Sequence, residues 1–272
     1  MTDLPVFVNG TADGTVSSAD RGLHYGHGLF ETMRLCGGAL PLWGWHWSRL
    51  SRGAAVLRIG LDRATVWDDL RRACGQWPAD GVVKLMITAG SGGTAYRHDD
   101  GPCNRYLFYR PLPARRDFVH LRVCDYRLPI NPHLAGIKHL NRLDQVLAAR
   151  QLPSDREGLL LDTGARVIEG LAGNIFVRTA AGWLTPDLRD AGVCGVMREY
   201  LRTEIFPALG LRVGEASLSL ADVHAARELF QCNAVRGIQA VTAIDGSDHL
   251  LAVDEILRIQ DELARRQPCF AA

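Results

Sequence analysis

Lysine is nearly absent from this chain of 272 residues. Lysine and arginine together number 31, yet only two of these residues, Lys84 and Lys138, are lysines. Arginine keeps its proton near neutral pH, whereas a desolvated lysine can lose its proton and act as a nucleophile or base. If the protein uses an amine for covalent chemistry, these two side chains and the N-terminus are the candidates.

Several other features are missing. No run approaches eighteen consecutive apolar residues, and residues 1–14 lack the long apolar core of a secretory signal. The seven cysteines, an odd number, include no C-x-x-C pair, which argues against a disulfide framework and a structural zinc site. A net charge of +1 gives no general attraction for nucleic acid or anionic membranes. We therefore expect a soluble cytoplasmic protein that binds no metal, nucleic acid or membrane.

Three common kinds of catalytic motif are also missing. The glycine-rich residues 90–93 follow an expected strand but lack the G-x-G-x-x-G spacing of a dinucleotide site. His24, His27, His133 and His139 do not have zinc-ligand spacing with acidic or thiol partners. The chain contains no G-x-S-x-G motif. Hydride transfer, metallohydrolysis and serine hydrolysis therefore have no support in the sequence.

Apolar runs and turn residues predict an α+β protein, with many short strands and a few helices that do not strictly alternate. Two prolines and paired arginines in residues 111–116 predict an exposed linker. We expect a small N-terminal domain (1–110), a linker (111–118) and a larger C-terminal domain (119–272). The expected helices cover residues 44–58, 63–76, 139–151, 196–209 and 253–266, and the expected strands cover 4–9, 30–35, 82–88, 105–109, 119–126, 158–162, 167–169, 174–178, 183–185, 229–232 and 239–243.

The two lysines differ in their surroundings. Lys138 follows an irregular, proline-containing loop, and its apolar neighbours Ile137 and Leu140 would partly desolvate its amine and lower its pKa. The alternative is an ammonium group that reaches water from a helix end, and the local sequence alone favours that alternative. The helix expected after Lys138 has an apolar stripe that includes Leu143. Strand alternation places Lys84 either on a solvated face, which we favour, or near a site.

Three further positions fit an anionic, ring-containing ligand. Residues 195–198 open an expected helix, whose free N–H groups and dipole suit a phosphate. Arg49 could add a bidentate contact, and Glu169 at a strand end could pair with a cationic ring nitrogen. Each of these positions would equally suit an ordinary surface or strand-end residue.

Taken together and in this order, these segments resemble the fold-type-IV pyridoxal-phosphate enzymes, a family of branched-chain and D-amino acid aminotransferases and aminodeoxychorismate lyases. The resemblance extends from about Phe7 to Ala243. The block from His133 to Leu143, HLAGIKHLNRL, looks most like the aminodeoxychorismate lyases and reverses the preference for a solvated Lys138. The other matching segments are residues 20–22, 25–32, 46–50, 169–176 and 192–198.

The resemblance implies a role for each matching residue. Lys138 would hold pyridoxal 5'-phosphate covalently and act as the catalytic base, and Glu169 would contact the pyridine nitrogen. Phe30 and Thr32 would face the substrate, with Thr32 close to the reaction. The phosphate and ring would also be held by Arg49, Val193, Val196, Met197, Asn233 and Ala234. Arg97 and Arg105 are our candidates for the two substrate carboxylates, although both could be ordinary surface arginines.

The implied activity is a lyase that releases pyruvate from 4-amino-4-deoxychorismate and leaves 4-aminobenzoate for folate biosynthesis. The resemblance also implies a homodimer and a barrel-like sheet in the C-terminal domain, which would carry the lysine. Two alternatives remain: an aminotransferase for D- or branched-chain amino acids, and a non-catalytic protein that binds a phosphorylated metabolite. His27 stands where the family usually has aspartate, and residues 171–173 replace a more serine-rich stretch.

Overall fold

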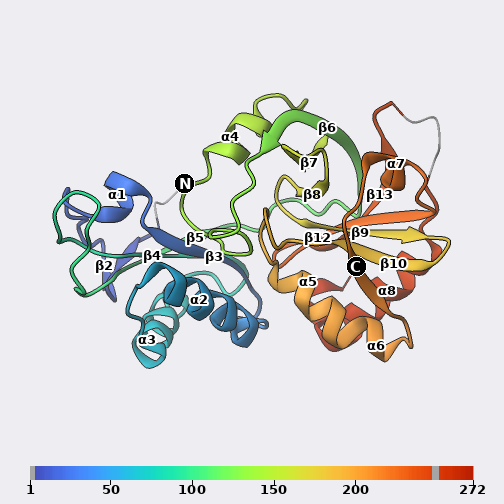
Figure 1. Ribbon diagram of the computed structural model, residues 1–272. Coiled ribbons are helices and arrows are strands. Elements are labelled where there is room, and N and C mark those ends of the chain that lie inside the picture. The colour runs from blue at the N-terminus through green and yellow to red at the C-terminus, as the bar shows by residue number, and fades with distance from the viewer. Residues whose placement is uncertain (1–3, 247–250, 272) are drawn as a thin grey trace. The chain divides into compact units, whose positions relative to one another are not determined.

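The computed structural model describes residues 4–246 and 251–271, and it forms two compact units (Figure 1). The first unit comprises residues 1–113 together with the short segment 137–141, and the second comprises residues 114–136 and 142–272. The chain therefore passes from one unit to the other within the linker expected at 111–118. Lys138 belongs to the first unit, whereas the sequence placed it in the C-terminal domain.

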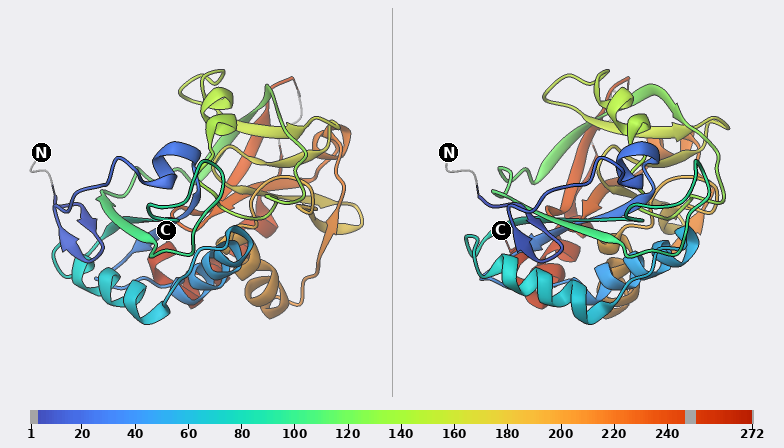
Figure 2. Two further views of the ribbon diagram at one scale, coloured as in Figure 1. Left: turned by 60° about the vertical axis from the view of Figure 1, so that its left-hand side comes forward. Right: turned by 90° about the vertical axis from the view of Figure 1, so that its left-hand side faces the viewer.

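The first unit is built on a five-stranded sheet with the order β2-β1-β5-β4-β3. Two helices, α2 and α3, cover one face of this sheet, as the views in Figures 1 and 2 agree. The elements are β1 (Phe7–Val8), β2 (Thr11–Ala12), α1 (Arg21–Tyr25), β3 (Gly28–Leu35), α2 (Trp43–Leu57), α3 (Arg63–Cys74), β4 (Gly81–Thr88) and β5 (Asn104–Arg110).

Helices α2 and α3 begin and end close to where the sequence predicts. Asp62 caps α3 by accepting the backbone N–H of Thr65, which supplies a partner for a donor that the first turn leaves unpaired. Arg58 ends α2 in the left-handed conformation, with φ of 53°. The expected helices 44–58 and 63–76 are thus confirmed to within two residues.

Strand register divides the sheet of the first unit into two faces. Leu29, Ile87 and Arg105 lie side by side on the face that α2 and α3 cover, where Leu29 and Ile87 are buried. Thr32 and Lys84 are paired on the other face, which Phe30 shares. This alternation places the side chains expected to face a substrate on the side of the sheet away from the helices.

The helix predicted over residues 139–151 begins later than expected. Residues 138–140 are extended and pair with β3, an edge strand: Phe30 N–H donates to the Lys138 carbonyl (3.0 Å), and Leu140 N–H donates to the Gly28 carbonyl (2.9 Å). Backbone groups used in this pairing cannot join a helix, so α4 covers only Leu143–Ala149. The predicted apolar stripe is also wrong, because Leu140 lies outside the helix and Leu143 is 74% exposed.

The second unit is an eight-stranded sheet with the order β11-β10-β9-β12-β13-β6-β7-β8. Strand β6 runs parallel to both of its neighbours, β13 and β7. The strands are β6 (Phe118–Leu128), β7 (Glu157–Asp162), β8 (Val167–Gly170), β9 (Asn174–Thr179), β10 (Gly182–Pro186), β11 (Val213–Ala216), β12 (Glu228–Asn233) and β13 (Gly237–Ile244).

Apolar side chains from the whole width of this second sheet meet in one core. Leu121 from β6, Val167 from β8, Ile175 from β9 and Val241 from β13 belong to the same buried cluster. The edge strand β8 also contacts β9 and β10, so the sheet curves round its core, in agreement with the barrel-like sheet that the resemblance implied. The α+β class is confirmed.

The helices of the second unit lie mostly on one side of the sheet (Figure 1). A continuous helical stretch consists of α5 (Val196–Tyr200), a π turn (Leu201–Ile205) and α6 (Phe206–Ala208), which matches the helix expected over 196–209. The remaining elements are α7 (Leu220–His224), α8 (Asp254–Arg266) and a 3-10 turn (Pro268–Phe270). The sequence did not predict α1, α7, β2 or β11, which are at most five residues long.

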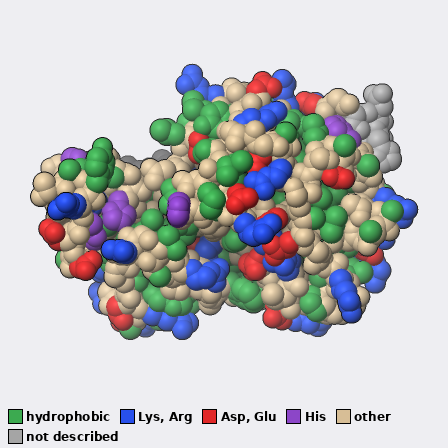
Figure 3. All heavy atoms as spheres, viewed as in Figure 1, with side chains coloured by type: hydrophobic (Ala, Val, Ile, Leu, Met, Phe, Trp, Pro, Cys, Tyr) green, Lys and Arg blue, Asp and Glu red, His purple; other side chains and the backbone are tan. Residues whose placement is uncertain are grey.

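Basic and acidic groups are interspersed over the face of the molecule in Figure 3, consistent with the net charge of +1. Within residues 4–246 and 251–271, no helix is long and apolar enough to cross a membrane.

Candidate functional site

Both lysines of the chain lie beside one aromatic ring in the first unit. The Lys138 Nζ is 4.5 Å from the centre of the Phe30 ring, and the Lys84 Nζ is 5.1 Å from it. Burial, and then the charge of Arg110, lower the pKa of Lys84. Lys84 is therefore not on a fully solvated face, as we had favoured, but is a second amine near Phe30 and Lys138.

A buried cluster of charged and polar groups lies on the helix-covered face of the same sheet. Glu31 accepts the Nε–H of Arg49 at 2.8 Å and a second hydrogen bond from the same guanidinium. His46 Nδ1 lies 2.6 Å from Oε2 of Glu31, the oxygen that also accepts the second bond from Arg49. Burial alone would raise the pKa of Glu31, but the charge of Arg49 and the contact with His46 outweigh it and lower that pKa to about 2. Glu31 is thus ionised at neutral pH and orients both partners.

One atom of this cluster has no partner. Burial lowers the pKa of His46 and, with the charges of Arg49 and Lys138, outweighs the contact with Glu31, which raises it. The ring is therefore neutral at neutral pH. Because Nδ1 donates to Glu31, the lone pair of the neutral ring is on Nε2. Within the described part of the chain, Nε2 is buried and makes no hydrogen bond. A buried polar atom without a partner is costly and indicates a place for a ligand.

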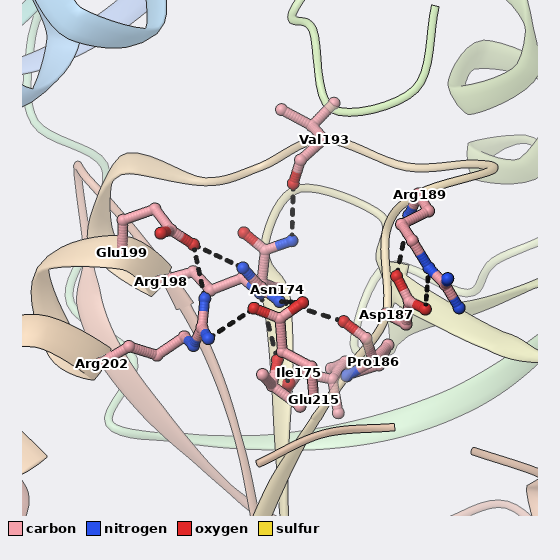
Figure 4. A network of polar contacts seen from close by, with 11 residues as sticks. Asn174, Ile175, Pro186, Asp187, Arg189, Val193, Arg198, Glu199, Arg202 and Glu215 are labelled. Carbon is pink, nitrogen blue, oxygen red and sulfur yellow. Dashed lines mark hydrogen bonds and ion pairs between the residues drawn. The ribbon is translucent and has the colours of Figure 1, made fainter. Parts of the chain in front are cut away.

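In the second unit, Glu169 and Asn174 hold one short loop from two sides. The Asn174 side-chain amide donates to the Val193 carbonyl at 2.8 Å (Figure 4). The Val193 N–H donates to Oε2 of Glu169 at 2.9 Å. Glu169 and Asn174 are both buried. These two bonds therefore fix the backbone of Val193.

Two glycines allow this close approach. Gly192 has φ of +83°, a conformation that other residues rarely adopt. A Cβ added to Gly195 would lie 1.9 Å from Oδ1 of Asn174, so the loop can sit against Asn174 only if this residue is glycine.

Gly195→Ala is expected to destabilise the second unit by about 1–3 kcal/mol, the usual cost of overpacking, because Asn174 must move and give up its bond to Val193. Urea unfolding monitored by circular dichroism measures this loss. Gly44→Ala is the matched control, since an added Cβ there has no neighbour within 4 Å and alanine favours helix. Equal unfolding curves for Gly195→Ala and the unaltered protein would contradict the expected role of Gly195.

The start of α5 is anchored by Arg198, which the sequence analysis had not singled out. This buried guanidinium donates to the Pro186 carbonyl at 3.1 Å (Figure 4). It also donates to the Thr185 hydroxyl at 3.2 Å. It also pairs with Glu199 and Glu215. These contacts fix the backbone of Val196 and Met197, two buried residues expected to contact a phosphate.

The turn after β12 is also rigid. Oδ1 of Asn233 accepts the backbone N–H groups of Val235 and Arg236, at 3.0 and 2.8 Å. This is the local turn geometry that asparagine favours. Asn233 and Ala234 therefore have a fixed backbone.

The two arginines proposed for substrate carboxylates differ sharply. Arg105 lies on the helix-covered face, where its Nε donates to Asp69 on α3 at 2.7 Å. Phe30 and Thr32 lie on the opposite face, so Arg105 cannot bind a substrate that these two residues face. Arg97 is exposed in the loop between β4 and β5 and remains a candidate for binding a substrate carboxylate.

Sequence reasoning missed Glu31 and His46, although strand alternation contained a signal for Glu31. Glu31 lies between Phe30 and Thr32, so a strand with those two residues on one face must turn a carboxylate toward the core. A buried carboxylate requires partners.

Within residues 4–246 and 251–271, no group of three or more His, Cys, Asp or Glu side chains could hold a metal ion.

Comparisons with known proteins agree with this arrangement. The model of the amino-transferase class IV family matches residues 28–244. An aminodeoxychorismate lyase of Vibrio harveyi is 33% identical over 256 residues, or 89% of this chain and 92% of that protein. A putative branched-chain-amino-acid aminotransferase of Methanocaldococcus jannaschii is 28% identical, over 89% of this chain and 88% of that protein. The crystal structure of a 4-amino-4-deoxychorismate lyase from Pseudomonas aeruginosa superposes with a TM-score of 0.90 and 38% identity, covering 96% of this chain and 98% of that one.

Proposed function

Because the chain belongs to the class IV aminotransferase family, we propose that it is a pyridoxal-phosphate-dependent lyase that converts 4-amino-4-deoxychorismate into 4-aminobenzoate and pyruvate. The resemblance inferred from the sequence is confirmed at the level of the family. The observation that carries the choice of reaction is the likeness, over nearly the whole chain, to two proteins described as lyases of this substrate.

The residues present suit the cofactor. Lys138 supplies the amine, and Arg49 is oriented by Glu31. Within the described residues the buried Nε2 of His46 makes no hydrogen bond, and the glycines at 192 and 195 let the Val193 loop pack closely against Glu169 and Asn174. We assign the phosphate to Arg49, the backbone of Val196 and Met197, and the turn at Asn233 and Ala234. Bound pyridoxal phosphate supplies an electron sink for the carbon next to the substrate amine.

The chain's own residues then have distinct tasks. Lys138 accepts the proton that the C4 carbon of the substrate loses, and for this it must be uncharged. Glu169, an acceptor next to the Val193 N–H, keeps a proton on the ring nitrogen of the cofactor. The bond between C3 and the enolpyruvyl oxygen breaks with its electron pair on oxygen, and the leaving group takes up a proton to become pyruvate. The six-membered ring that remains is aromatic, which drives the elimination.

Incubation of the purified protein with 4-amino-4-deoxychorismate tests the proposal. Pyruvate, followed by coupled reduction to lactate, and fluorescent 4-aminobenzoate are expected to form in equal amounts. The similarity to an aminotransferase makes amino-group exchange the main alternative. If a keto acid is required and only exchange occurs, the lyase proposal is wrong and the aminotransferase is right.

The cellular context of this reaction is part of the same proposal. A lyase producing 4-aminobenzoate serves folate biosynthesis in the cytoplasm, and we expect it to work as a homodimer. Light scattering coupled to gel filtration is expected to give twice the chain mass of 29.9 kDa. A mass of one chain at working concentrations would refute the dimer and leave the reaction untouched.

A further inference from the structure

Arg21, in the short helix α1, is buried although it lies next to an exposed loop. It is 5% exposed, and its guanidinium reaches into the loop that joins β4 to β5. Both terminal nitrogens donate to backbone carbonyls there. The four acceptors lie within six residues of one another: Gly92 (3.2 Å), Ala95 (3.0 Å), Tyr96 (3.2 Å) and Arg97 (3.2 Å).

His27 completes the surroundings of this guanidinium. Arg21 Nε donates to His27 Nδ1 at 3.3 Å, and a guanidinium has no acceptor atom, so Nδ1 must accept. The ring proton is then on Nε2, which lies 2.9 Å from the Leu57 carbonyl and donates to it. The Tyr25 ring covers the guanidinium at 4.8 Å. Within the described residues, no hydrogen-bond or ion-pair partner of Arg21 is a carboxylate, so carbonyl dipoles and a neutral ring balance its charge.

The same segment of chain also fixes the start of the loop, directly after β4. The Arg21 N–H donates to the Gly90 carbonyl at 2.8 Å, and the Ala89 N–H donates to the His27 carbonyl at 3.0 Å. Residues 91–97 are all exposed and would otherwise be free to adopt many conformations. Hydrogen bonds from the buried Arg21 guanidinium to the carbonyls of these residues favour a single conformation of the loop. An exposed loop held in this way is prepared to bind a ligand.

We propose that Arg21 is a positioning residue for substrate binding: with His27, it fixes the loop of residues 91–98 so that the Arg97 side chain meets a carboxylate of the substrate. The inference rests on the proposed function, which supplies a substrate with two carboxylates. Arg97 is the cation whose own backbone carbonyl Arg21 holds. Lysine at position 21 would keep the charge but could not bind four carbonyls and a ring nitrogen at once.

Arg21→Lys is expected to raise KM for 4-amino-4-deoxychorismate about tenfold and to change kcat less than about threefold, as loss of uniform binding does. Trypsin is expected to cut after Arg97 about tenfold faster, because a loosened loop fits the protease more often. Mass spectrometry identifies that cut, and absorbance shows that the cofactor is still bound. Arg71→Lys is the matched control, since Arg71 is exposed on α3 and, among the residues that the structure describes, its side chain pairs with Asp68 alone, at the surface. Arg71→Lys is expected to change neither KM nor the rate of tryptic cleavage after Arg97.

Two further variants keep the test decisive. Arg97→Gln is expected to raise KM as much as Arg21→Lys does, and the double variant no further, because the two changes remove one interaction. If Arg21→Lys does not fold, His27→Phe replaces it: the ring next to His98 is kept while both nitrogens are lost, so KM and cleavage are expected to rise in the same direction.

Unchanged KM in folded variants with faster cleavage would show that the loop is held but takes no part in binding, which overturns the inference. An unchanged rate of tryptic cleavage in Arg21→Lys would show that Arg21 does not hold the loop, and this result would also overturn the inference. Additive effects of the two substitutions would likewise reject the link from Arg21 to Arg97. Absence of pyruvate release from the unaltered protein is a separate result, because it refutes the proposed function while the cleavage rates still report on Arg21.

Discussion

Replacing Lys138 with arginine is expected to lower kcat for pyruvate release by more than about 10⁴-fold, beyond the usual contribution of a general base alone. Arginine keeps a positive charge near Phe30, but it cannot lose its proton near neutral pH and cannot bind the aldehyde of the cofactor as lysine does. Reduction with borohydride followed by peptide mapping is expected to find the cofactor on Lys138 in the unaltered protein. It is expected to find no adduct in the Lys138→Arg variant.

Lys84 provides an internal control for this experiment. Its amine lies 5.1 Å from the same Phe30 ring and burial lowers its pKa, so proximity to Phe30 alone does not separate the two lysines. We expect Lys84→Arg to retain the adduct on Lys138. An adduct that maps to Lys84, or undiminished turnover by Lys138→Arg, would contradict the assignment of Lys138 as the reactive amine.

The fold was predictable wherever local pattern and tertiary structure demand the same conformation. The alternation in β4 and the capped start of α3 at Asp62 are examples. Prediction failed after Lys138, because residues 138–140 extend the sheet at the edge strand β3, a partner more than a hundred residues away in the chain. Leucine spacing describes a preference for helix, and it cannot show that a free strand edge competes for the same backbone.

The candidate site was predictable to a different degree. Motif resemblance indicated Lys138, Glu169 and the loop at Val193, because their chemistry depends on residue type and order. The hydrogen-bond partners of the site residues were not predictable from the sequence. The carboxylate that orients Arg49 belongs to Glu31 on β3, and the side chain of Arg105 is bound to Asp69 on α3. Strand register would have excluded Arg105, but the register itself emerges only when β5 is paired with β4.

Glu31→Gln is expected to destabilise the first unit by about 3–5 kcal/mol, because it leaves the buried guanidinium of Arg49 without its compensating charge. Glu31 and Arg49 are both buried, so water cannot replace the lost carboxylate. Urea unfolding at pH 7 measures the change. The matched control is Asp68→Asn, which breaks the exposed pair with Arg71 and is expected to cost less than about 1 kcal/mol.

The pH dependence of this loss distinguishes a charge effect from a change of shape. The pKa of Glu31 falls from 4.5 in a free side chain to about 2 in the folded protein, so the stabilisation that ionisation provides is complete above pH 4.5. Below that, it declines as the pH falls toward about 2, because the unfolded chain takes up a proton on Glu31 in this range whereas the folded state does not. Glutamine resembles a protonated glutamate, so the stability difference between Glu31→Gln and the unaltered protein is expected to shrink steadily from pH 5 to pH 2.5. A difference that stays constant over this range would mean that Glu31 acts through packing alone, and that Arg49 is not held ready for a phosphate by its charge.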